Sequence, residues 1–350
     1  MIHLRQAWPA PASPRPIVIV GAGSIVRTAH LPAYQRLRFP VAGLFDIRGE
    51  VAAETGRLAG GLPVFTTMEA ACAVPSAVFD VAVPGGAILD VLERLPRGAA
   101  VLIQKPIGET LADARRIGRV CHDRRFIAAA NLQLRFSPNM MVLADLIAAD
   151  RLGDLVDIDV RIIDRQPWEQ WGFLKGAPRL EVLYHSIHYL DAIRWIAGEP
   201  LGVMCRAVAH PLLPAFRDTR STIVLDYGDR IRCGLVLNHT HAWDATYRAS
   251  TFTVEGTRGA ARGTLGVNLD YPCGEPDALE ISTGGSWENV PLRGSWFTEA
   301  FEGPMSNLQR FVAGEDRALV SPIDDAIKTM ALVEACYTAS AAGSTPIPVA

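Results

Sequence analysis

The first third of the chain alternates short apolar runs with stretches whose polar and apolar residues recur at helical spacing. The apolar runs cover residues 17–20, 41–45, 78–83, 99–103 and 126–130. The stretches with helical spacing between them cover residues 48–60, 86–95 and 110–124. Thr110 and Asp113 resemble a capping box that opens the last of these helices. This alternation predicts an α/β fold with a parallel, doubly wound sheet over residues 16–130.

After about residue 150 the pattern changes to strands in which apolar and polar residues alternate. Residues 156–164 alternate with period two, and residues 221–240 predict a hairpin that turns at Gly228 and Asp229. Further strands are predicted over 251–266 and 278–292, and helices over 181–197, 300–313 and 323–342. We therefore expect a second α/β domain over residues 131–350 with a large, open, mostly antiparallel sheet. Its last helix can pack back on the first domain.

The first fifteen residues are rich in Pro and contain no apolar core segment. They resemble neither a signal peptide nor a membrane anchor, so we expect a flexible leader over residues 1–15. No uninterrupted apolar run of the chain reaches membrane-spanning length.

Composition narrows the class of protein. The chain has 350 residues, which is enough for two domains, and its net charge of −3 gives no electrostatic reason to expect nucleic acid or a membrane as a partner. The six cysteines are scattered, with no CxxC pair, which predicts reduced thiols in a cytoplasmic protein. We expect a small-molecule substrate.

The stretch "IVIVGAGSIV", residues 17–26, predicts a dinucleotide site. A strand runs into Gly21 and Gly23, which let the backbone approach a pyrophosphate, and the helix that follows offers its first amides to the negative charge. Val26 stands where the third small residue of the fingerprint is expected. The alternative interpretation is an ordinary turn at the end of a strand.

A second feature favours the dinucleotide. Asp46 ends the second strand at the distance where an acid binds the ribose hydroxyls, although it could instead only start the next helix. Asp46 would repel a 2′-phosphate and favours NAD, whereas Arg48 leaves NADP possible. The predicted cofactor residues are Gly21, Gly23, Ser24, Ile25, Asp46, Arg48, Pro84, Gln104 and Lys105.

Several stretches together resemble the glucose–fructose oxidoreductase / inositol dehydrogenase (Gfo/Idh/MocA) family. They are "IQKPIGETLADARRI" (103–117), "NLQLRFSPNM" (131–140), "EVLYHSIHYLDAIRWIAGEP" (181–200), "VEGTRGA" (254–260) and "MALVEACYTASAAG" (330–343). The resemblance implies a Rossmann domain, a C-terminal sheet that forms a homodimer or homotetramer, and a reaction on a sugar, polyol or similar molecule.

Two residues depart from the family pattern. Gln104 stands before Lys105 and Pro106, where the family usually has Glu. Tyr184 stands four residues before His188, where the family often has Asp. The first change removes a carboxylate that can tune Lys105, and the second removes a frequent partner in proton transfer.

Lys105 is the first candidate acid/base residue. It follows the predicted strand over 99–103, at the sheet edge where ligands bind in such folds. A desolvated Lys there can have its pKa lowered into a useful range. The alternative is a surface Lys before a turn-forming Pro.

The predicted helix over 181–197 carries the other candidates. His185, His188 and Asp191 are three residues apart and share a face, and His188 matches the family's active-site His. Tyr184 points the same way and can assist, as can His185. Asp191 can orient His188 or contact substrate. Each His can alternatively be a packed helix residue, and no third ligand at metal-binding spacing follows.

In addition to Asp191, four residues are predicted to contact the substrate. Trp168 and Trp171 offer aromatic faces to a sugar or an aglycone, or else they pack in the core. Gln133 and Arg135 open the second domain and are weaker candidates. The run 238–241, "NHTH", either lines the pocket or lies at the sheet surface.

Three functions are compatible with these residues. The first is an NAD(P)-dependent oxidoreductase that moves a hydride between nicotinamide and a hydroxyl or carbonyl carbon. The second is a glycosidase that retains NAD and oxidises its substrate transiently. The third is a regulator that binds dinucleotide without catalysis.

Overall fold

The computed structural model describes residues 4–348 and divides the chain into two compact units. Of the described residues, the first unit contains 4–142 together with Arg293–Met330, and the second contains Leu143–Leu292 and 331–348. The segment Arg293–Met330 thus returns to the first unit after the chain has passed through the second.

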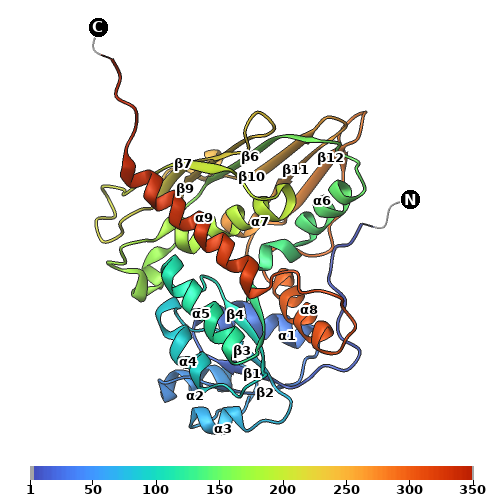
Figure 1. Cartoon of the computed structure of the whole chain (residues 1–350), viewed down its shortest axis with the longest axis vertical. Coiled ribbons are helices and arrows are strands. Elements are labelled where there is room, and N and C mark those ends of the chain that lie inside the picture. The colour runs from blue at the N-terminus through green and yellow to red at the C-terminus, as the bar shows by residue number, and fades with distance from the viewer. Residues whose placement is uncertain (1–3, 349–350) are drawn as a thin grey trace. The chain divides into compact units, whose positions relative to one another are not determined.

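The first unit is built on a parallel five-stranded sheet with the strand order β2-β1-β3-β4-β5 (Figure 1). The strands are β1 (Ile17–Val20), β2 (Val41–Phe45), β3 (Val78–Val81), β4 (Ala100–Gln104) and β5 (Ile127–Asn131). The chain reverses its direction of travel across the sheet between β1 and β3. In open parallel sheets, ligands bind at such a switch point, outside the carboxyl ends of the strands.

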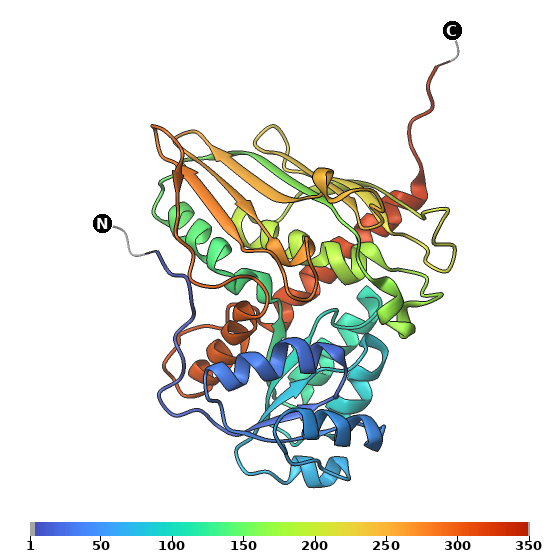
Figure 2. The ribbon, with the colours of Figure 1, turned by 180° about the vertical axis from the view of Figure 1, so that it is seen from behind.

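Helices cover both faces of this sheet. Figures 1 and 2 show α4 and α5 on one face and α1 and α8 on the other. The α-helices are α1 (Leu31–Arg36), α2 (Gly49–Leu58), α3 (Met68–Cys72), α4 (Ile88–Arg94), α5 (Leu111–Asp123) and α8 (Glu302–Val312). A π-helical turn, η1 (Val26–His30), leads into α1, and 3₁₀ turns lie at η2 (Gly85–Ala87), η3 (Gln133–Phe136) and η9 (Glu299–Phe301).

The capping box predicted at the start of α5 is confirmed. Thr110 Oγ1 accepts a 3.1 Å hydrogen bond from the Asp113 amide, and Asp113 Oδ2 accepts one of 3.2 Å from the Thr110 amide. The shorter acid therefore replaces Glu without losing the reciprocal bond.

The leader has a defined path from residue 4 on, unlike the flexible segment that the sequence predicted. Trp8 Nε1 donates to Asp316 Oδ2 at 2.7 Å, and the Trp8 ring lies edge-on to Phe136 at 5.5 Å between centroids. The Arg15 amide donates to Gln309 Oε1 at 2.6 Å. Residues 1–3 lie outside the described part of the chain.

The second unit is built on an eight-stranded sheet with the order β13-β12-β11-β10-β6-β9-β8-β7. β6 and β9 are parallel, and the other described pairs are antiparallel, which confirms the predicted mostly antiparallel sheet. The strands are β6 (Leu155–Ile163), β7 (Gly202–Val208), β8 (Arg220–Asp226), β9 (Arg232–Asn238), β10 (Ala249–Gly256), β11 (Ala260–Thr264), β12 (Ala278–Ser282) and β13 (Glu288–Asn289).

Helices line one face of this sheet (Figures 1 and 2). They are α6 (Pro138–Ala148), α7 (Ile187–Ala197) and α9 (Ile323–Ala342), of which α6 and α9 begin in the first unit. A π-helical turn, η6 (Val182–Ser186), leads into α7, and 3₁₀ turns lie at η4 (Trp168–Gln170), η5 (Gly172–Leu174), η7 (Ala245–Tyr247) and η8 (Gly266–Asn268). Burial alternates along β8, as one covered face requires. None of the helices in the described residues is long and apolar enough to cross a membrane.

Candidate functional site

The two glycines of the turn after β1 serve different purposes. Gly21 has φ +108°, and a Cβ there would lie 2.3 Å from the Ala82 carbonyl oxygen, so the fold itself requires a glycine. A Cβ at Gly23 would meet no protein atom within 4 Å. The space in front of Gly23 is therefore open, as a ligand that approaches the backbone needs.

Asp46 lies against the same turn. Its Oδ2 accepts a 2.9 Å hydrogen bond from the Ala22 amide, and its Oδ1 accepts one of 2.9 Å from the Arg48 amide. Arg48 Nε lies 3.5 Å from Oδ1. A carboxylate offers about four acceptor positions, so Asp46 retains capacity for the two hydroxyls of a ribose.

The helix after the turn begins at Ser24 and runs without a break into α1. Its first amides, those of Ser24 and Ile25 among them, have no partner within the helix and can receive an anion. Val26 is fully buried in the core and belongs to the π-helical turn η1. The helix therefore accommodates Val at the third motif position by packing it inward.

The ends of β3 and β4 add two more predicted residues to this sheet edge. Pro84 follows β3 and is exposed, and Lys105 follows β4 directly and is partly exposed. Desolvation lowers the pKa of Lys105 to about 8. The Lys105–Pro106 peptide bond is cis. The carboxyl edge thus carries an open glycine turn, an acceptor for a ribose and a lysine, and these residues fit a bound dinucleotide.

Gln133 and Arg135 lie on η3 and are buried. The Arg135 guanidinium donates to the Val320 carbonyl at 2.8 Å and pairs with Asp325 Oδ2 at 2.5 Å. These contacts join η3 to the start of α9, which gives Arg135 a structural role. Contact of either residue with substrate stays a prediction.

The candidate residues of the predicted 181–197 helix lie in two consecutive segments, a π-helical turn and an α-helix. Tyr184 and His185 lie in the π-helical turn η6, and His188 and Asp191 lie in α7. The His185 and His188 rings are 6.4 Å apart between centroids. π-Helical turns inside α-helices occur frequently at functional sites.

The side chains around this helix show further contacts. Tyr184 lies edge-on to Phe173 at 5.9 Å between ring centroids. Buried Asp191 lies 3.9 Å from Arg194 Nη1. Orientation of His188 by Asp191 stays a prediction.

The two candidate tryptophans differ in burial. Trp168 is 2% exposed, and its ring lies edge-on to Trp171, His185 and His239. This environment favours the packing role of Trp168 over a sugar-binding surface. Trp171 is partly buried and lies 5.6 Å from the Tyr271 ring.

A buried charge cluster in the second unit escaped the sequence analysis. His239 Nδ1 lies 2.7 Å from Asp164 Oδ1, His239 Nε2 lies 3.4 Å from Glu181 Oε1, and Ser186 Oγ donates to that same Glu181 oxygen. Burial alone would lower the pKa of His239, but the two carboxylates outweigh it and raise the pKa to about 9. The available signal was that Asp164 ends the strand predicted over 156–164 and that His239 lies at the end of the hairpin predicted over 221–240.

The cluster lies against the π-helical turn. The His239 ring is tilted by 47° against the His185 ring with 4.0 Å between centroids, and Glu181 directly precedes η6. Of the "NHTH" run, His239 is fully buried, which excludes a position at the sheet surface.

A second buried network in the first unit was also missed. His30 Nδ1 lies 2.6 Å from Asp80 Oδ2, which also accepts a 2.8 Å hydrogen bond from the Tyr34 hydroxyl. Gln104 Nε2 lies 3.0 Å from His30 Nε2. Burial, and then the Asp80 charge, raise the pKa of Tyr34 well above its usual value.

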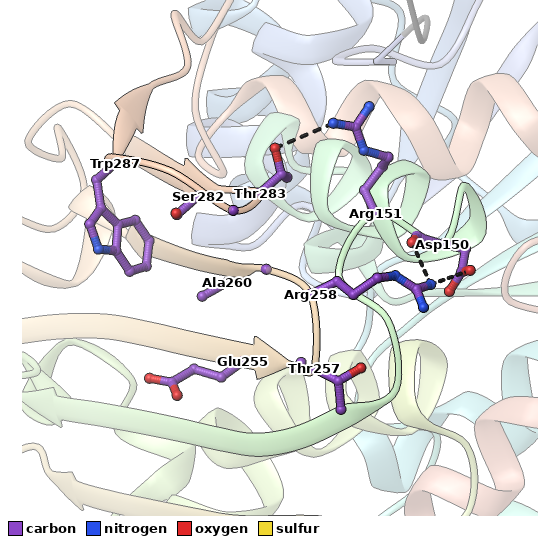
Figure 3. A pocket seen from close by; sticks show the side chains of 12 residues that line it. Asp150, Arg151, Glu255, Thr257, Arg258, Ala260, Ser282, Thr283 and Trp287 are labelled. Atoms are coloured by element: carbon purple, nitrogen blue, oxygen red, sulfur yellow. Dashed lines mark hydrogen bonds and ion pairs between the residues drawn. The ribbon is translucent and has the colours of Figure 1, made fainter.

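A shallow pocket of about 710 Å³ lies elsewhere in the second unit (Figure 3). Arg258 pairs with Asp150 at its rim, Arg151 donates to Thr283 Oγ1 at 3.3 Å, and Trp287 lines the other side. None of the candidate residues lines this pocket, so we do not assign it to the site. In the described residues, no group of three His, Cys, Asp or Glu side chains is arranged to hold a metal ion.

Comparison with family models identifies the family to which a chain with this fold belongs. Residues 15–131 match the family model described as "Oxidoreductase family, NAD-binding Rossmann fold", and residues 140–262 match "GFO/IDH/MocA C-terminal domain". The chain belongs to the Gfo/Idh/MocA family.

Sequence similarity to one curated protein is partial. The uncharacterized protein y4oX of Sinorhizobium fredii (strain NBRC 101917 / NGR234) is 24% identical over 197 residues. The match covers 54% of this chain and 54% of that protein, so the chain matches about half the length of this relative.

Solved structures share the fold over nearly the whole chain. An oxidoreductase from Agrobacterium radiobacter, in complex with NAD+, L-tartaric acid and magnesium, has a TM-score of 0.79 at 17% identity and covers 94% of this chain and 97% of its own. Aldose-aldose oxidoreductase from Caulobacter crescentus, complexed with glycerol, has a TM-score of 0.78 at 19% identity and covers 95% and 99%. At these identities the likeness establishes the fold.

Proposed function

We propose that this protein is an NAD-dependent oxidoreductase acting on a hydroxyl or carbonyl carbon of a sugar, polyol or related small molecule. The observation that carries the proposal is the contact of Asp46 with the open glycine turn, where Oδ2 accepts from the Ala22 amide at 2.9 Å. This contact joins the pyrophosphate element and the ribose element of a dinucleotide site.

Asp46 also supports NAD over NADP. A carboxylate at this position repels a 2′-phosphate and accepts hydrogen bonds from the two ribose hydroxyls. Arg48 could favour NADP, but its Nε is already 3.5 Å from Asp46 Oδ1. Turning Arg48 to a phosphate would cost this interaction.

When bound, the nicotinamide supplies the hydride acceptor or donor. Lys105 takes the hydroxyl proton of the substrate as a neutral amine, or returns it in the reverse direction. A pKa of about 8 leaves a useful fraction of Lys105 neutral near physiological pH. His188 acts as a second acid/base group, with Tyr184 and His185 assisting.

The substrate class rests on the family and on proteins of the same fold. The Agrobacterium radiobacter structure holds L-tartaric acid and the Caulobacter crescentus structure holds glycerol, and both molecules carry neighbouring hydroxyl groups. Trp171, Gln133, Arg135 and Asp191 are the candidates for contacting such a molecule.

We place the protein in the cytoplasm and expect a homodimer or homotetramer through the uncovered face of the eight-stranded sheet. Apolar side chains on this sheet are exposed, including Met204 at 63%, Val224 at 38% and Val236 at 37%. A second copy that covers this face would bury them.

The test is turnover with a panel of pentoses, hexoses, inositols and their lactones, followed by nicotinamide absorbance. The proposal expects net NADH formation with at least one alcohol, or net NADH consumption with a lactone. Release of an aglycone from a glycoside without net NADH formation would identify an NAD-retaining glycosidase instead. Dinucleotide binding without any turnover would favour a regulator.

A further inference from the structure

We propose that His30 and Gln104 form a matched, uncharged pair that positions Lys105, with Asp80 fixing the His30 ring. This inference rests on the proposed role of Lys105 in proton transfer. Neither the family pattern nor the sequence analysis gave His30 or Asp80 a role, and Gln104 stood as a predicted cofactor residue and as a departure from the usual Glu.

The orientation of the Gln104 amide follows from its contact with Lys105. The backbone N–H of Lys105 can only donate, and it lies 2.7 Å from the Gln104 side-chain oxygen, Oε1. The Gln104 NH₂ group must therefore be the one that faces His30 Nε2 at 3.0 Å. The orientation thus does not depend on an arbitrary choice between oxygen and nitrogen.

The Gln104 amide in turn fixes the protonation of His30. His30 Nε2 faces an NH₂ donor and must accept, and the Asn131 NH₂ lies 3.4 Å from the same nitrogen. The ring proton then resides on Nδ1, where Asp80 Oδ2 accepts it at 2.6 Å. His30 is a neutral imidazole with a single allowed tautomer in this arrangement.

The network is buried and spans three strands of the sheet. His30, Asp80 and Asn131 are at most 1% exposed, and Gln104 is 7% exposed. Asp80 lies on β3, Gln104 ends β4 and Asn131 ends β5. Because Gln104 directly precedes Lys105, a fixed Gln104 side chain fixes the peptide from which the lysine projects.

A carboxylate at position 104 would not fit this network as it stands. One oxygen could still accept from the Lys105 amide, but the other would face the lone pair of His30 Nε2. The conflict is relieved if a proton enters between the new carboxylate and His30 Nε2, and on the nitrogen that proton makes His30 an imidazolium between two carboxylates. The titratable groups of the network are His30 on η1, Tyr34 on α1 and Asp80 on β3. Because Gln104 is uncharged, Asp80 is the one carboxylate among these residues.

The first experiment reads the His30 ring directly by ¹⁵N NMR of protein labelled in its eight histidines. A His30→Asn variant identifies the His30 signals. We expect a ring with its proton on Nδ1 and an unprotonated Nε2 in the wild-type protein, and an imidazolium in Gln104→Glu. The control is Gln35→Glu, an exposed change on α1 that should leave His30 unchanged. A wild-type His30 protonated on Nε2, or an unchanged ring in Gln104→Glu, would overturn the pairing.

The second experiment reads Lys105. The chain has only three lysines, and Lys175 and Lys328 are both exposed, so they serve as internal references for acylation followed by peptide mass spectrometry. Gln104→Leu removes both hydrogen bonds of the pair. We expect the pH of half-maximal Lys105 labelling to rise by roughly one unit toward the pKa of an ordinary lysine. The reason is that a Lys105 side chain no longer held in its desolvated position becomes hydrated. A structural role alone would lower the melting temperature and leave this pH unchanged, which would overturn the link to Lys105.

Both measurements are independent of turnover. Full oxidoreductase activity in a Lys105→Ala variant would refute the proposed catalytic role of Lys105 and leave the His30 tautomer and the labelling of the wild-type protein intact. Conversely, an unchanged labelling profile in Gln104→Leu would refute the positioning role while Lys105 could still be essential for catalysis.

Discussion

The Ala22 amide donates a 2.9 Å hydrogen bond to Oδ2 of Asp46, so the turn after β1 is joined to the end of β2. The Ala22 carbonyl is held as well, by a 3.0 Å hydrogen bond from the Thr55 hydroxyl. The turn is thus fixed from two sides before any ligand arrives, which lowers the ordering cost of binding.

Replacing Asp46 with Ala should reduce the preference for NADH over NADPH at least about tenfold, because the ribose acceptor and the repulsion of a 2′-phosphate are both lost. Fluorescence titration with each nucleotide measures the ratio of the two dissociation constants. Glu50→Ala, an exposed acid at the start of α2, is the matched control. An unchanged ratio in Asp46→Ala would mean that Asp46 does not contact the ribose.

The two glycines of the turn should respond differently to Ala. Gly21→Ala should destabilise the protein by about 2–4 kcal/mol, since its Cβ would overlap the Ala82 carbonyl and φ is +108°. Gly23→Ala should change stability by less than about 0.5 kcal/mol, because the new Cβ meets no protein atom, but it should weaken NADH binding roughly tenfold or more. Urea unfolding and NADH titration check the two effects. Wild-type NADH affinity in Gly23→Ala would place the dinucleotide elsewhere.

Lys105→Met should lower kcat/KM for the oxidation by about 10²–10⁴-fold and leave NADH affinity within about threefold. The control is Lys328→Met, on an exposed position of α9. The wild-type oxidation rate should rise with pH through about 8, since the neutral amine is the base and burial lowers the pKa of Lys105 to that value. Steady-state kinetics over pH 6–10 test both, and wild-type turnover in Lys105→Met would contradict the assignment.

The buried His239 should make stability fall as pH rises. Its pKa in the folded protein is raised from 6.5 to about 9, so the folded state holds the proton more tightly than the unfolded state. The resulting stabilisation is fully present below about pH 6.5 and is lost as pH rises through 9, with a total on the order of a few kcal/mol.

His239→Gln removes this titration and keeps a donor toward Asp164. The difference in unfolding free energy between wild type and His239→Gln, measured in urea at steps from pH 6 to 9.5, should therefore shrink as pH rises. Parallel wild-type and His239→Gln curves would mean that His239 is not protonated in the folded protein.

Local signals in the sequence were sufficient for much of the fold. The Thr110 and Asp113 pair located the start of α5, because a capping box needs residues only three positions apart. The helix predicted over 323–342 coincides with α9. The helix α6 was missed, although Pro138 at its first position followed by an apolar run is a recognisable start.

Contacts of the candidate site between residues far apart in the sequence could not be predicted from the sequence. His30 and Asp80 are fifty residues apart, and only the pairing of β1 with β3 brings their elements together. The π-helical turns around His30 and His185 have no simple sequence signature. The sequence could not distinguish a buried Trp168 from a sugar-binding one, because both require the same residue in the same loop.

Binding of NADH to the wild-type protein, compared with NADPH under identical conditions, tests the central claim most directly. A calorimetric titration of protein free of co-purified nucleotide should give saturable binding of both, with NADH at least tenfold tighter. Absence of binding by either nucleotide would contradict the assignment of the turn after β1 as a cofactor site, and with it the oxidoreductase function.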